Sequence, residues 1–284
     1  MRITSSVVIF RANKDDLSKV ISSVVNSRIE MLYIVDNSPH SEDAVRILAA
    51  NPKTEYIFGQ GNVGYGAGHN IAIKKAMSEG AEYHIVLNPD VEFKADVIEK
   101  MLMYADGHKE TGLIMPKIFF PDGRIQYLCK LLPAPLDWIL RRFAPSISAV
   151  RKRNEKFELR GSGYNKIMNV PYLSGCFMFF RTDVLRDVGL FDEKIFMYGE
   201  DTDITRRIHR KYQTVFFPDV SIIHKFNRKS YSNLHLLYIH IKSAIYYFNK
   251  WGWFFDSERG KINRKVLIEI FGNAGGKTDI KARV

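Results

Sequence analysis

The sequence predicts an α/β fold in which helices cover both faces of a mostly parallel central sheet. Through residues 1–115, short apolar runs alternate with segments whose apolar residues recur at helical spacing, and this alternation is typical of βαβ units. Hydrophobic residues make up 46% of the 284 residues and charged residues 26%. These fractions are those of globular proteins and exclude the disordered and fibrous classes.

The first half of the chain supplies the parallel strands. Residues 4–10 form a β-branched apolar run, and a helix follows behind Asn13 or Asp15 as N-cap, with apolar residues at i, i+3, i+4 and i+7. We expect the later elements in this order: strand 29–35, helix 41–50, strand 55–58, helix 67–79 with Gly80 as C-cap, strand 83–87, helix 95–104 and strand 112–115.

After Pro116 the alternation breaks. Residues 141–166 are polar, basic and glycine-bearing, and they predict an insertion or loop. Regular structure is expected again as strand 176–180, helix 202–211, and two short strands at 214–217 and 220–223.

An amphipathic helix is predicted over residues 231–255, with one apolar stripe made of Leu234, Leu237, Tyr238, Ile241, Ile245, Phe248, Gly252 and Phe255. This helix either packs on the core or lies at a membrane interface. Residues 256–284 show little periodicity and are expected to be a frayed basic tail.

The charge distribution and the cysteine content of the sequence restrict the kinds of partner and site that we expect. Residues 221–284 carry 12 Lys/Arg against 4 Asp/Glu, and residues 141–166 carry 8 against 2, so most of the net charge of +11 lies in two segments. Such segments suit an anionic partner such as a membrane leaflet, nucleic acid or polyphosphate, although solvated surface charge is the alternative. The two cysteines predict neither a disulfide framework nor a zinc site, and we expect no signal peptide and no membrane-spanning segment.

Candidate site residues follow the predicted strands, because ligands of open parallel sheets bind beyond the carboxyl ends of the strands. Asp36 follows the second strand, where its carboxylate could accept a nucleobase imide N–H or simply stabilise a turn. Asp90 follows the fourth strand and suits a hard metal ion, or caps the next helix. His224, after the last short strand, could join a metal site, contact phosphate or be structural.

A glycine-rich segment, residues 59–70, follows the third strand, and glycine there permits close approach of a ligand. Gly59, Gly61 and Gly64 satisfy GxGxxG, so a dinucleotide site and a plain turn-rich loop are both alternatives. Against the dinucleotide site, the glycines follow the third strand, the helix is expected only after Gly68, and no acidic residue closes the next strand.

Adjacent carboxylates, Glu200 and Asp201, precede the predicted helix 202–211. A carboxylate projecting from such a point could act as a general base. The alternative is structural: Asp201 or Thr202 as the N-cap, and Asp203 with Arg207 as an i,i+4 ion pair.

Together these segments resemble the family 2 inverting glycosyltransferases of the GT-A fold, in particular the rhamnosyltransferase-like branch. The resemblance covers residues 3 to about 250 and rests on VDNS (35–38), NVGYGAGHN (62–70), LNPDV (87–91), LSGCFMFFR (173–181) and GLFDEKIFMYGEDTDITRR (189–207). It implies a GT-A-type nucleotide-diphospho-sugar transferase fold. The catalytic domain would span residues 1–230, with a nucleotide-binding half (1–115), an acceptor-binding half (116–230) and the basic loop 141–166, followed by the helix 231–255 and the tail 256–284.

The resemblance also implies a role for each candidate residue. Asp201 would be the catalytic base, preceded by Glu200, and Asp90 with His224 would hold Mg²⁺ or Mn²⁺. Residues expected to contact or shape the nucleotide-sugar site are Asp36, Arg11, Asn62, Gly64, Gly68, Asn70 and Asn88. Residues expected on the acceptor side are Asp192, Ser174, Gly175 and Cys176. Two positions depart from the family pattern: Arg11 to Asn13 replace the usual Thr-Tyr/Phe-Asn, and Asn88 replaces the first carboxylate of the DxD metal motif.

The implied activity is sugar transfer from a UDP- or dTDP-sugar, rhamnose among the candidate sugars, to a saccharide or a polyprenyl-diphosphate-linked acceptor in cell-surface polysaccharide synthesis. The chain lacks the QxxRW motif of processive synthases. We expect a cytoplasmic enzyme, peripheral on the anionic inner face of the cell membrane, with no nucleic-acid partner. The alternatives are an NAD(P)-dependent Rossmann-type enzyme, a basic nucleic-acid-binding protein, and a nucleotide-sugar-binding scaffold without activity.

Overall fold

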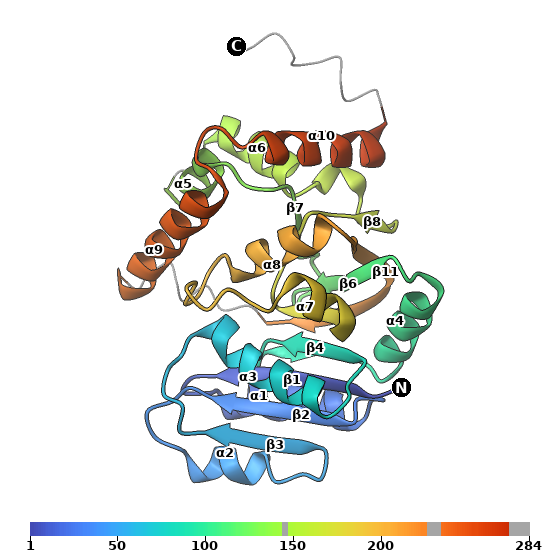
Figure 1. Cartoon of the computed structure of the whole chain (residues 1–284), viewed down its shortest axis with the longest axis vertical. Helices are drawn as coiled ribbons and strands as arrows, with labels where there is room; N and C mark the ends of the chain where they lie inside the picture. Colours follow the sequence, from blue (N-terminus) through green and yellow to red (C-terminus); the bar gives the residue numbers. More distant parts are fainter. Residues whose placement is uncertain (144–146, 226–233, 273–284) are drawn as a thin grey trace.

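The computed structural model describes residues 1–143, 147–225 and 234–272 (Figure 1). Its first elements in chain order are β1 (Ile3–Ile9), α1 (Lys14–Val25), β2 (Met31–Asp36), α2 (Asp43–Leu48), β3 (Thr54–Phe58), α3 (Tyr65–Ser78), β4 (Tyr83–Leu87), β5 (Val91–Glu92), α4 (Asp96–Gly107) and β6 (Thr111–Phe119). The remaining elements are β7 (Cys129–Lys130), α5 (Pro135–Phe143), α6 (Ser148–Phe157), η1 (Arg160–Ser162), β8 (Met168–Asn169), β9 (Tyr172–Leu173), β10 (Phe177–Arg181), α7 (Thr182–Val188), α8 (Glu200–His209), β11 (Gln213–His224), α9 (Leu234–Trp251) and α10 (Ser257–Phe271).

The central sheet has the strand order β3-β2-β1-β4-β10-β6-β11-β5, with β8 paired to β11. Strands β3, β2, β1 and β4 are parallel neighbours, and β6 is parallel to β11. Strand β10 is antiparallel to both β4 and β6, so it joins the two halves of the chain into one sheet. The longest ladders are parallel, and the predicted mostly parallel α/β sheet is confirmed.

Strand β1 shows why this sheet is covered on both faces. Val7 and Ile9 belong to the apolar core that includes Leu17 of α1, whereas Val8 packs with Ala72 of α3. Because successive side chains of a strand point to opposite faces, these neighbours bury apolar surface against helices on both sides.

Helix α3 begins two residues earlier than predicted. Gly64 is its N-cap with φ of 93°, in the left-handed region that glycine favours, and a Cβ there would overlap the carbonyl oxygen of Phe196. A Cβ on Gly68 would lie 2.8 Å from the side chain of Val8. The absence of a Cβ at Gly64 and Gly68 therefore allows α3 to pack closely against the backbone of Phe196 and against the sheet.

Two strand predictions are corrected. The strand predicted over residues 112–115 continues to Phe119 as β6. Residues 214–223 form one strand, β11, where two short strands were predicted. The ladder between β11 and β6 shifts register between Phe217 and Ser221. Pro218 lies in this shift; since proline lacks an N–H, the strand bulges there without ending.

The predicted loop 141–166 and the predicted frayed tail are wrong over most of their length. Residues 148–157 form α6 and residues 257–271 form α10. Both are held by tertiary contacts. The Leu131 N–H donates to the C=O of Phe157 in α6 at 3.0 Å, the side chain of Asn263 in α10 bonds both the N–H and the C=O of Leu132, and Lys166 Nζ donates to Ile270 O at 2.8 Å. The last part of the expected tail, residues 273–284, lies outside the described residues.

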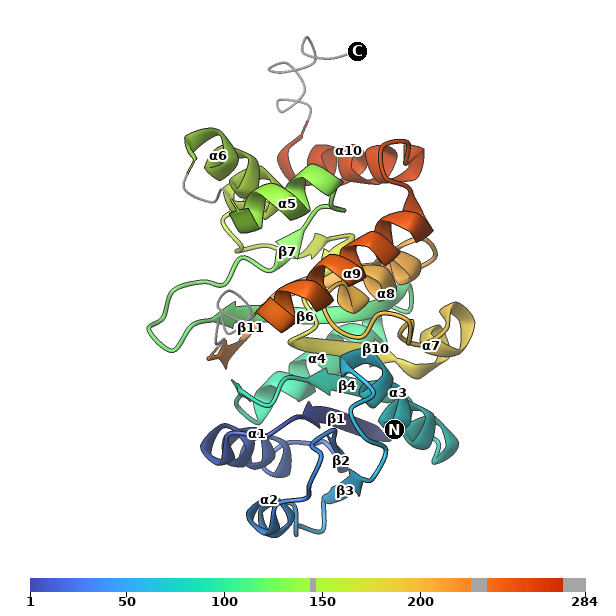
Figure 2. The same ribbon diagram turned by 90° about the vertical axis from the view of Figure 1, so that its left-hand side faces the viewer.

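Helices α5, α6, α9 and α10 gather at one end of the molecule, far from β3 and α2 (Figures 1 and 2). We call these four helices the helical cap. Helices α6, α9 and α10 of the cap contain described parts of both basic segments identified in the sequence. Among the described residues, no helix is both long enough and apolar enough to cross a bilayer. Cys129 and Cys176 are both buried and free, as expected.

Candidate active site

Tyr65, on the first turn of α3, links the end of β4 to the segment before β10. Its Oη lies 2.9 Å from Asn88 Oδ1 and 2.8 Å from the carbonyl oxygen of Gly175. The Gly175 N–H in turn donates to Asp201 Oδ2 at 3.0 Å. Side chains that lie more than a hundred residues apart in the chain are thus joined by direct hydrogen bonds.

The same network reaches Asp90 through Asn88 and His224. His224 Nε2 lies 3.2 Å from Asn88 Nδ2 and 3.2 Å from Asp90 Oδ1. Strands β5 and β11 produce this contact because Val91 pairs with His224 in their antiparallel ladder. Contacts through Asn88, Tyr65 and Gly175 therefore link the surroundings of Asp90 to Asp201.

Gln126 holds the imidazole of His224 in place from the other side. Its Oε1 lies 2.9 Å from His224 Nδ1, and its Nε2 donates to the carbonyl oxygen of His224 at 2.6 Å. Since the Gln126 carbonyl can only accept, Nδ1 must carry a proton, and Nε2 is the nitrogen turned toward Asp90.

Asp90 and His224 each stabilise the charged form of the other. Burial alone would lower the pKa of His224, but the Cys176 sulfur and the Asp90 carboxylate outweigh burial and raise that pKa to about 10. Burial likewise opposes ionisation of Asp90, yet its hydrogen bond to His224 leaves the pKa of Asp90 below its usual value. Asp90 is therefore a carboxylate at neutral pH.

The donor set of Asp90 and His224 fits the expected divalent cation once His224 Nε2 has lost its proton, because only an unprotonated ring nitrogen can bind a metal ion. Mg²⁺ is usually held by one or two carboxylates together with substrate phosphates and water, and imidazole is a ligand that Mn²⁺ accepts. Three or more His, Cys, Asp or Glu side chains do not come together as a metal cluster anywhere in residues 1–143, 147–225 and 234–272. A cation held by Asp90 and His224 would thus take most of its ligands from elsewhere.

Helix α8 begins at Glu200, and its N-cap is Gly199, so neither Asp201 nor Thr202 is the cap. Asp201 instead accepts from the Gly175 N–H through Oδ2 and from the Thr202 N–H through Oδ1. The Asp203–Arg207 pair expected in the structural alternative is present at 2.9 Å, one turn further along the helix. Asp90 likewise caps no helix, because α4 begins at Asp96 after Ala95.

Burial raises the pKa of both members of the Glu200–Asp201 pair. For Glu200, burial and the adjacent Asp201 charge raise the pKa to about 8, and its Oε2 has no hydrogen-bond partner among the described residues. For Asp201, burial is the largest influence, and the Lys130 charge partly opposes it. In such surroundings the protonated form of a carboxyl group is favoured over the ionised form.

Asp36 lies at the end of β2 and is 2% exposed. Its Oδ1 accepts from the Ser38 N–H at 2.8 Å and its Oδ2 from Tyr56 Oη at 2.5 Å. The turn-stabilising alternative is thus present in the structure. A nucleobase contact of Asp36 stays a prediction, and it would use a remaining lone pair of this carboxylate.

The glycine-rich segment connects Asp36 to the network. Asn37 Nδ2 donates to Gly64 O at 3.0 Å, one residue before Tyr65. Asn62 is exposed, and its Oδ1 accepts from the Gly64 N–H at 3.3 Å. Asn70 is buried and bonds both the N–H and the C=O of Phe191, so it attaches α3 to the segment before α8.

The remaining predicted residues lie around the network without direct bonds to its carboxylates. The side chain of Arg11 is exposed and stacks near Phe10, at a backbone φ of 49°. Ser174 precedes Gly175, and the Cys176 carbonyl accepts from the Asn88 N–H at 2.9 Å. Asp192 faces α9, where Tyr246 and Lys250 donate to its carboxylate.

Three residues of the site were not among the predicted ones: Tyr65, Gln126 and Lys130. Tyr65 stands inside the glycine-rich motif, and its spacing from Gly64 was the available signal. Nothing in the local sequence marks Gln126, which follows a turn, or Lys130, on the two-residue strand β7. Only the fold brings them to His224 and Asp201.

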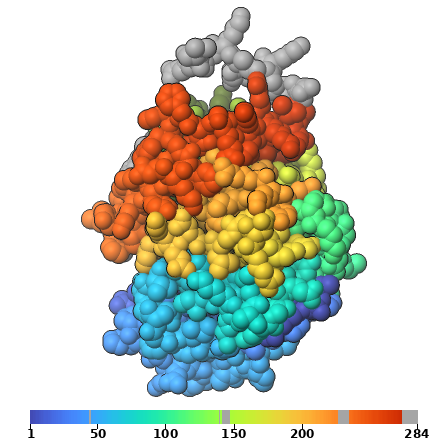
Figure 3. Space-filling model, in the orientation of Figure 1, coloured from blue at the N-terminus to red at the C-terminus, as the bar shows by residue number. Residues whose placement is uncertain are grey.

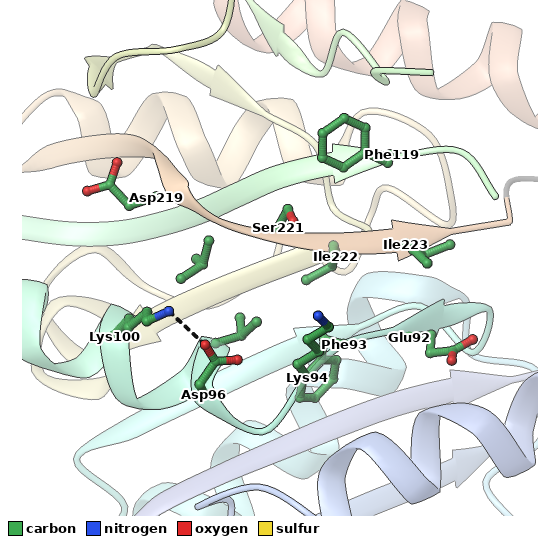
Figure 4. Close-up of a pocket in the computed structure, with 12 residues that line it drawn as sticks. Glu92, Phe93, Lys94, Asp96, Lys100, Phe119, Asp219, Ser221, Ile222 and Ile223 are labelled. Carbon is green, nitrogen blue, oxygen red and sulfur yellow. Dashed lines mark hydrogen bonds and ion pairs between the residues drawn. The ribbon is translucent and has the colours of Figure 1, made fainter. Parts of the chain in front are cut away.

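A surface cavity of about 360 Å³ is lined by residues of β5, α4 and β11, among them Glu92, Lys100 and Ile223 (Figure 4). Asp90, His224 and Asp201 do not line it. This cavity is therefore not part of the candidate site.

Comparison with known proteins agrees with this arrangement. The chain is 26% identical over 210 residues to the low-salt glycan biosynthesis hexosyltransferase Agl10 of Haloferax volcanii, covering 73% of this chain and 62% of that protein. It is 26% identical over 216 residues to an N-acetylglucosaminyl-diphospho-decaprenol L-rhamnosyltransferase of Mycobacterium tuberculosis, covering 71% and 68%. It is 24% identical over 251 residues to rhamnosyltransferase WbbL of Escherichia coli, covering 85% and 90%.

Solved structures of glycosyltransferases share the fold. The mannosyltransferase PcManGT of Pyrobaculum calidifontis, in complex with GDP-Man and Mn²⁺, aligns with a TM-score of 0.58 at 14% identity, over 96% of this chain and 71% of that one. TarS 1-349 of S. aureus, in complex with UDP-GlcNAc, aligns with a TM-score of 0.56 at 14% identity, over 99% and 77%. The fold is the GT-A fold expected from the sequence.

The model of glycosyl transferase family 2 matches residues 5–189, which include β1 to β4, Asn88, Asp90 and Gly175. This match favours a glycosyltransferase over the NAD(P)-dependent and nucleic-acid-binding alternatives. This chain belongs to glycosyl transferase family 2.

Proposed function

We propose that this protein is an inverting, non-processive glycosyltransferase that moves a sugar from a nucleoside diphosphate to an acceptor hydroxyl. One observation carries the proposal. A series of contacts of 2.8–3.2 Å through His224, Asn88, Tyr65 and Gly175 links Asp90, which lies beside an imidazole, to Asp201, which lies beside a second buried carboxylate. The reaction needs one group for negative charge on the donor side and one for a proton on the acceptor side.

The reaction is a single displacement. Asp201 accepts the proton of the acceptor hydroxyl while that oxygen forms a bond to the anomeric carbon. The bond from the anomeric carbon to the diphosphate oxygen breaks on the opposite side, so the configuration inverts and the nucleoside diphosphate leaves. Glu200 is buried next to Asp201, so one proton on this pair of carboxylates is favoured over two negative charges.

Asp90 and His224 would hold Mg²⁺ or Mn²⁺ at the donor. Bound there, such a cation supplies positive charge to the leaving diphosphate. Gln126 keeps Nε2 of His224 turned to that position, and Asn88 holds the imidazole from the side of β4.

For substrates, we propose a UDP- or dTDP-sugar as donor, with rhamnose as the first candidate sugar, and a saccharide or polyprenyl-diphosphate-linked acceptor in cell-surface polysaccharide synthesis. The names of the relatives support this choice, because two of them are rhamnosyltransferases and one acts on a decaprenol-linked diphosphate. We further propose a cytoplasmic protein that binds peripherally to the anionic inner face of the cell membrane.

The test is release of nucleoside diphosphate from a panel of UDP-, dTDP- and GDP-sugars with Mg²⁺ or Mn²⁺, with and without a lipid-linked acceptor. We expect release from one donor, stimulation by the acceptor, and loss on adding EDTA. Absence of release from every donor with every acceptor class would contradict the proposal. Thermal-shift measurements with NADH serve as the control and are expected to show no binding.

A further inference from the structure

Helix α9 of the helical cap is apolar on two opposite sides. Its inner side is buried at Ile239, Ser243 and Tyr247. Its outer side carries a second apolar row, exposed at Leu234 (83%), Tyr238 (62%), Ile241 (45%) and Ile245 (45%). These four positions are spaced by four, three and four residues, so they form one stripe along the helix. Helix α9 therefore packs inward, as the core-packing alternative predicts, and it also leaves an apolar stripe outside.

The stripe continues into the turn after α9. Gly252, with φ of 102°, ends the helix, and the chain then exposes Trp253 (37%), Phe254 (79%) and Phe255 (99%) before α10 begins. We call Trp253 to Phe255 the aromatic turn. In Figure 2, α9 crosses the front of the molecule, and Figure 3 shows α9 and α10 as one continuous orange-to-red surface. Exposed aromatic side chains next to an aliphatic stripe are unusual for a surface that faces only water.

Cationic side chains accompany this apolar surface. Exposed Lys and Arg residues of the cap occur on three of its helices: Arg151, Lys152 and Lys156 of α6, Lys242 of α9, and Lys261, Arg264 and Lys265 of α10. By contrast, residues 1–58 at the other end, which hold β1 to β3 and α2, carry seven Lys/Arg and seven Asp/Glu and so have no such excess. An apolar stripe with cations around it is complementary to a bilayer that contains anionic lipids.

We propose that the outer stripe of α9 and the aromatic turn form a membrane-docking surface whose partner is a bilayer containing anionic lipids. The apolar side chains enter the region between headgroups and acyl chains, and the cap cations lie against the lipid phosphates. The helix stays parallel to the membrane plane, in keeping with the absence of a spanning helix among the described residues.

The inner side of α9 explains how docking serves the candidate site. Ser243 Oγ donates to Met197 O at 2.7 Å, and Lys250 lies 2.7 Å from Asp192 and 2.8 Å from Asp203. These contacts attach α9 to the segment that leads into α8 and its carboxylates Glu200 and Asp201. A docked α9 would hold this segment next to the bilayer and would thereby present a lipid-linked acceptor to Asp201. This consequence rests on the proposed function.

The experiment uses the full chain and vesicles of phosphatidylcholine alone or with phosphatidylglycerol, without any sugar donor. We expect binding in a flotation assay to the anionic vesicles, at least about tenfold weaker binding to the neutral ones, and a blue shift of tryptophan fluorescence as Trp253 leaves water. The double variants Phe254→Ser/Phe255→Ser and Ile241→Ser/Ile245→Ser should each weaken partitioning by about tenfold or more. Met103→Ser, which changes an exposed residue of α4, is the matched control and should leave partitioning unchanged.

Wild-type protein that does not bind anionic vesicles, or variants that bind like wild type, would overturn the proposal. Sedimentation velocity distinguishes the other occupant: concentration-dependent dimers abolished by the same variants, without vesicle binding, would assign the surface to a second copy of the chain. Because the assay contains no substrate, failure of vesicle binding is distinguishable from absence of sugar transfer, which is measured on a water-soluble acceptor.

Discussion

Asp90, which follows β4, and Asp201, in the first turn of α8, are both aspartates of the candidate site, yet their surroundings differ. Asp90 faces an imidazole whose pKa is raised to about 10, and its own pKa is lowered. Asp201 stands beside another carboxylate, Glu200, in a buried position, and its pKa is raised. A cation partner stabilises the charge of the first, whereas burial disfavours the charge of the second.

This difference assigns the two carboxylates to different tasks. A carboxylate that stays ionised can hold a cation near a diphosphate, and one that resists ionisation can take up a proton during the reaction. The two environments touch through the Tyr65 hydroxyl, which contacts Asn88 on one side and Gly175 on the other. Substitutions on either side therefore test whether the assignment is correct.

The largest effect is expected for Asp201→Asn. The amide cannot accept the proton of the acceptor, so turnover should fall by about 10² to 10⁴ while nucleotide binding persists. Rates of nucleoside diphosphate release and calorimetry of nucleotide binding measure the two quantities. Asp219→Asn, at an exposed aspartate, is the control and should behave like wild type. Equal turnover of Asp201→Asn and wild type would remove Asp201 as the base.

The next effect concerns Gln126, which fixes the imidazole of His224 on the Asp90 side. Gln126→Ala frees that ring, and the affinity for Mn²⁺ in the presence of a nucleoside diphosphate should fall by about 10- to 100-fold. Titration followed by the electron paramagnetic resonance of free Mn²⁺ measures it directly, without turnover. Gln213→Ala, at the start of β11, is the matched control. An unchanged Mn²⁺ affinity in Gln126→Ala would exclude His224 as an oriented ligand.

A smaller effect, on stability, is expected for Glu200→Gln. The pKa of Glu200 is raised from 4.5 to about 8, so the folded state disfavours its ionised form, and this penalty grows as the pH rises from 4.5 towards 8. The variant should therefore be more stable than wild type at pH 8 and equally stable near pH 4. Urea unfolding at the two pH values measures the difference, with Glu269→Gln of α10 as control. A variant less stable than wild type at pH 8 would show that the Glu200 carboxylate is favourably bound.

The smallest effect is expected for Tyr65→Phe, which removes the hydroxyl between the two environments. One hydrogen bond contributes about 0.5–1.5 kcal/mol, so stability should fall by that amount. In a double-mutant cycle with Asp201→Asn, measured on Mn²⁺ affinity, coupling is expected only if the two environments communicate through this hydroxyl. Strictly additive effects would mean that the carboxylates act independently.

Prediction from the sequence succeeded where the signal is local. Strand β4 has the predicted bounds, β1 and β2 agree within two residues, and Asn13 caps α1 as one of the two expected residues. Asp90 and Asp201 were identified because they follow elements whose apolar patterns are plain, and those elements lead to one edge of the sheet.

Prediction failed where structure depends on distant partners. The segment 148–157 has a polar, basic sequence with little apolar pattern, and it is helical because Val150 and Phe157 are buried within the cap. Helix α10 is likewise held from outside its own sequence, since Arg206 of α8 forms an ion pair with its N-cap, Asp256. Hydrogen bonds from residues more than fifty positions away leave no periodic trace in a local window.

The amino-acid sequence alone determined which chemical groups are present, in which order, and that they lie on a sheet with alternating helices, because side-chain periodicity and strand ends are local properties. Tertiary structure alone decided which carboxylate keeps its charge and which resists it, and that two separate basic segments share one apolar-striped cap. The reason is physical: the pKa of a side chain and the exposure of a helix face are set by the neighbours that folding brings to them, and the neighbours here, Gln126, His224 and α9, come from remote parts of the chain.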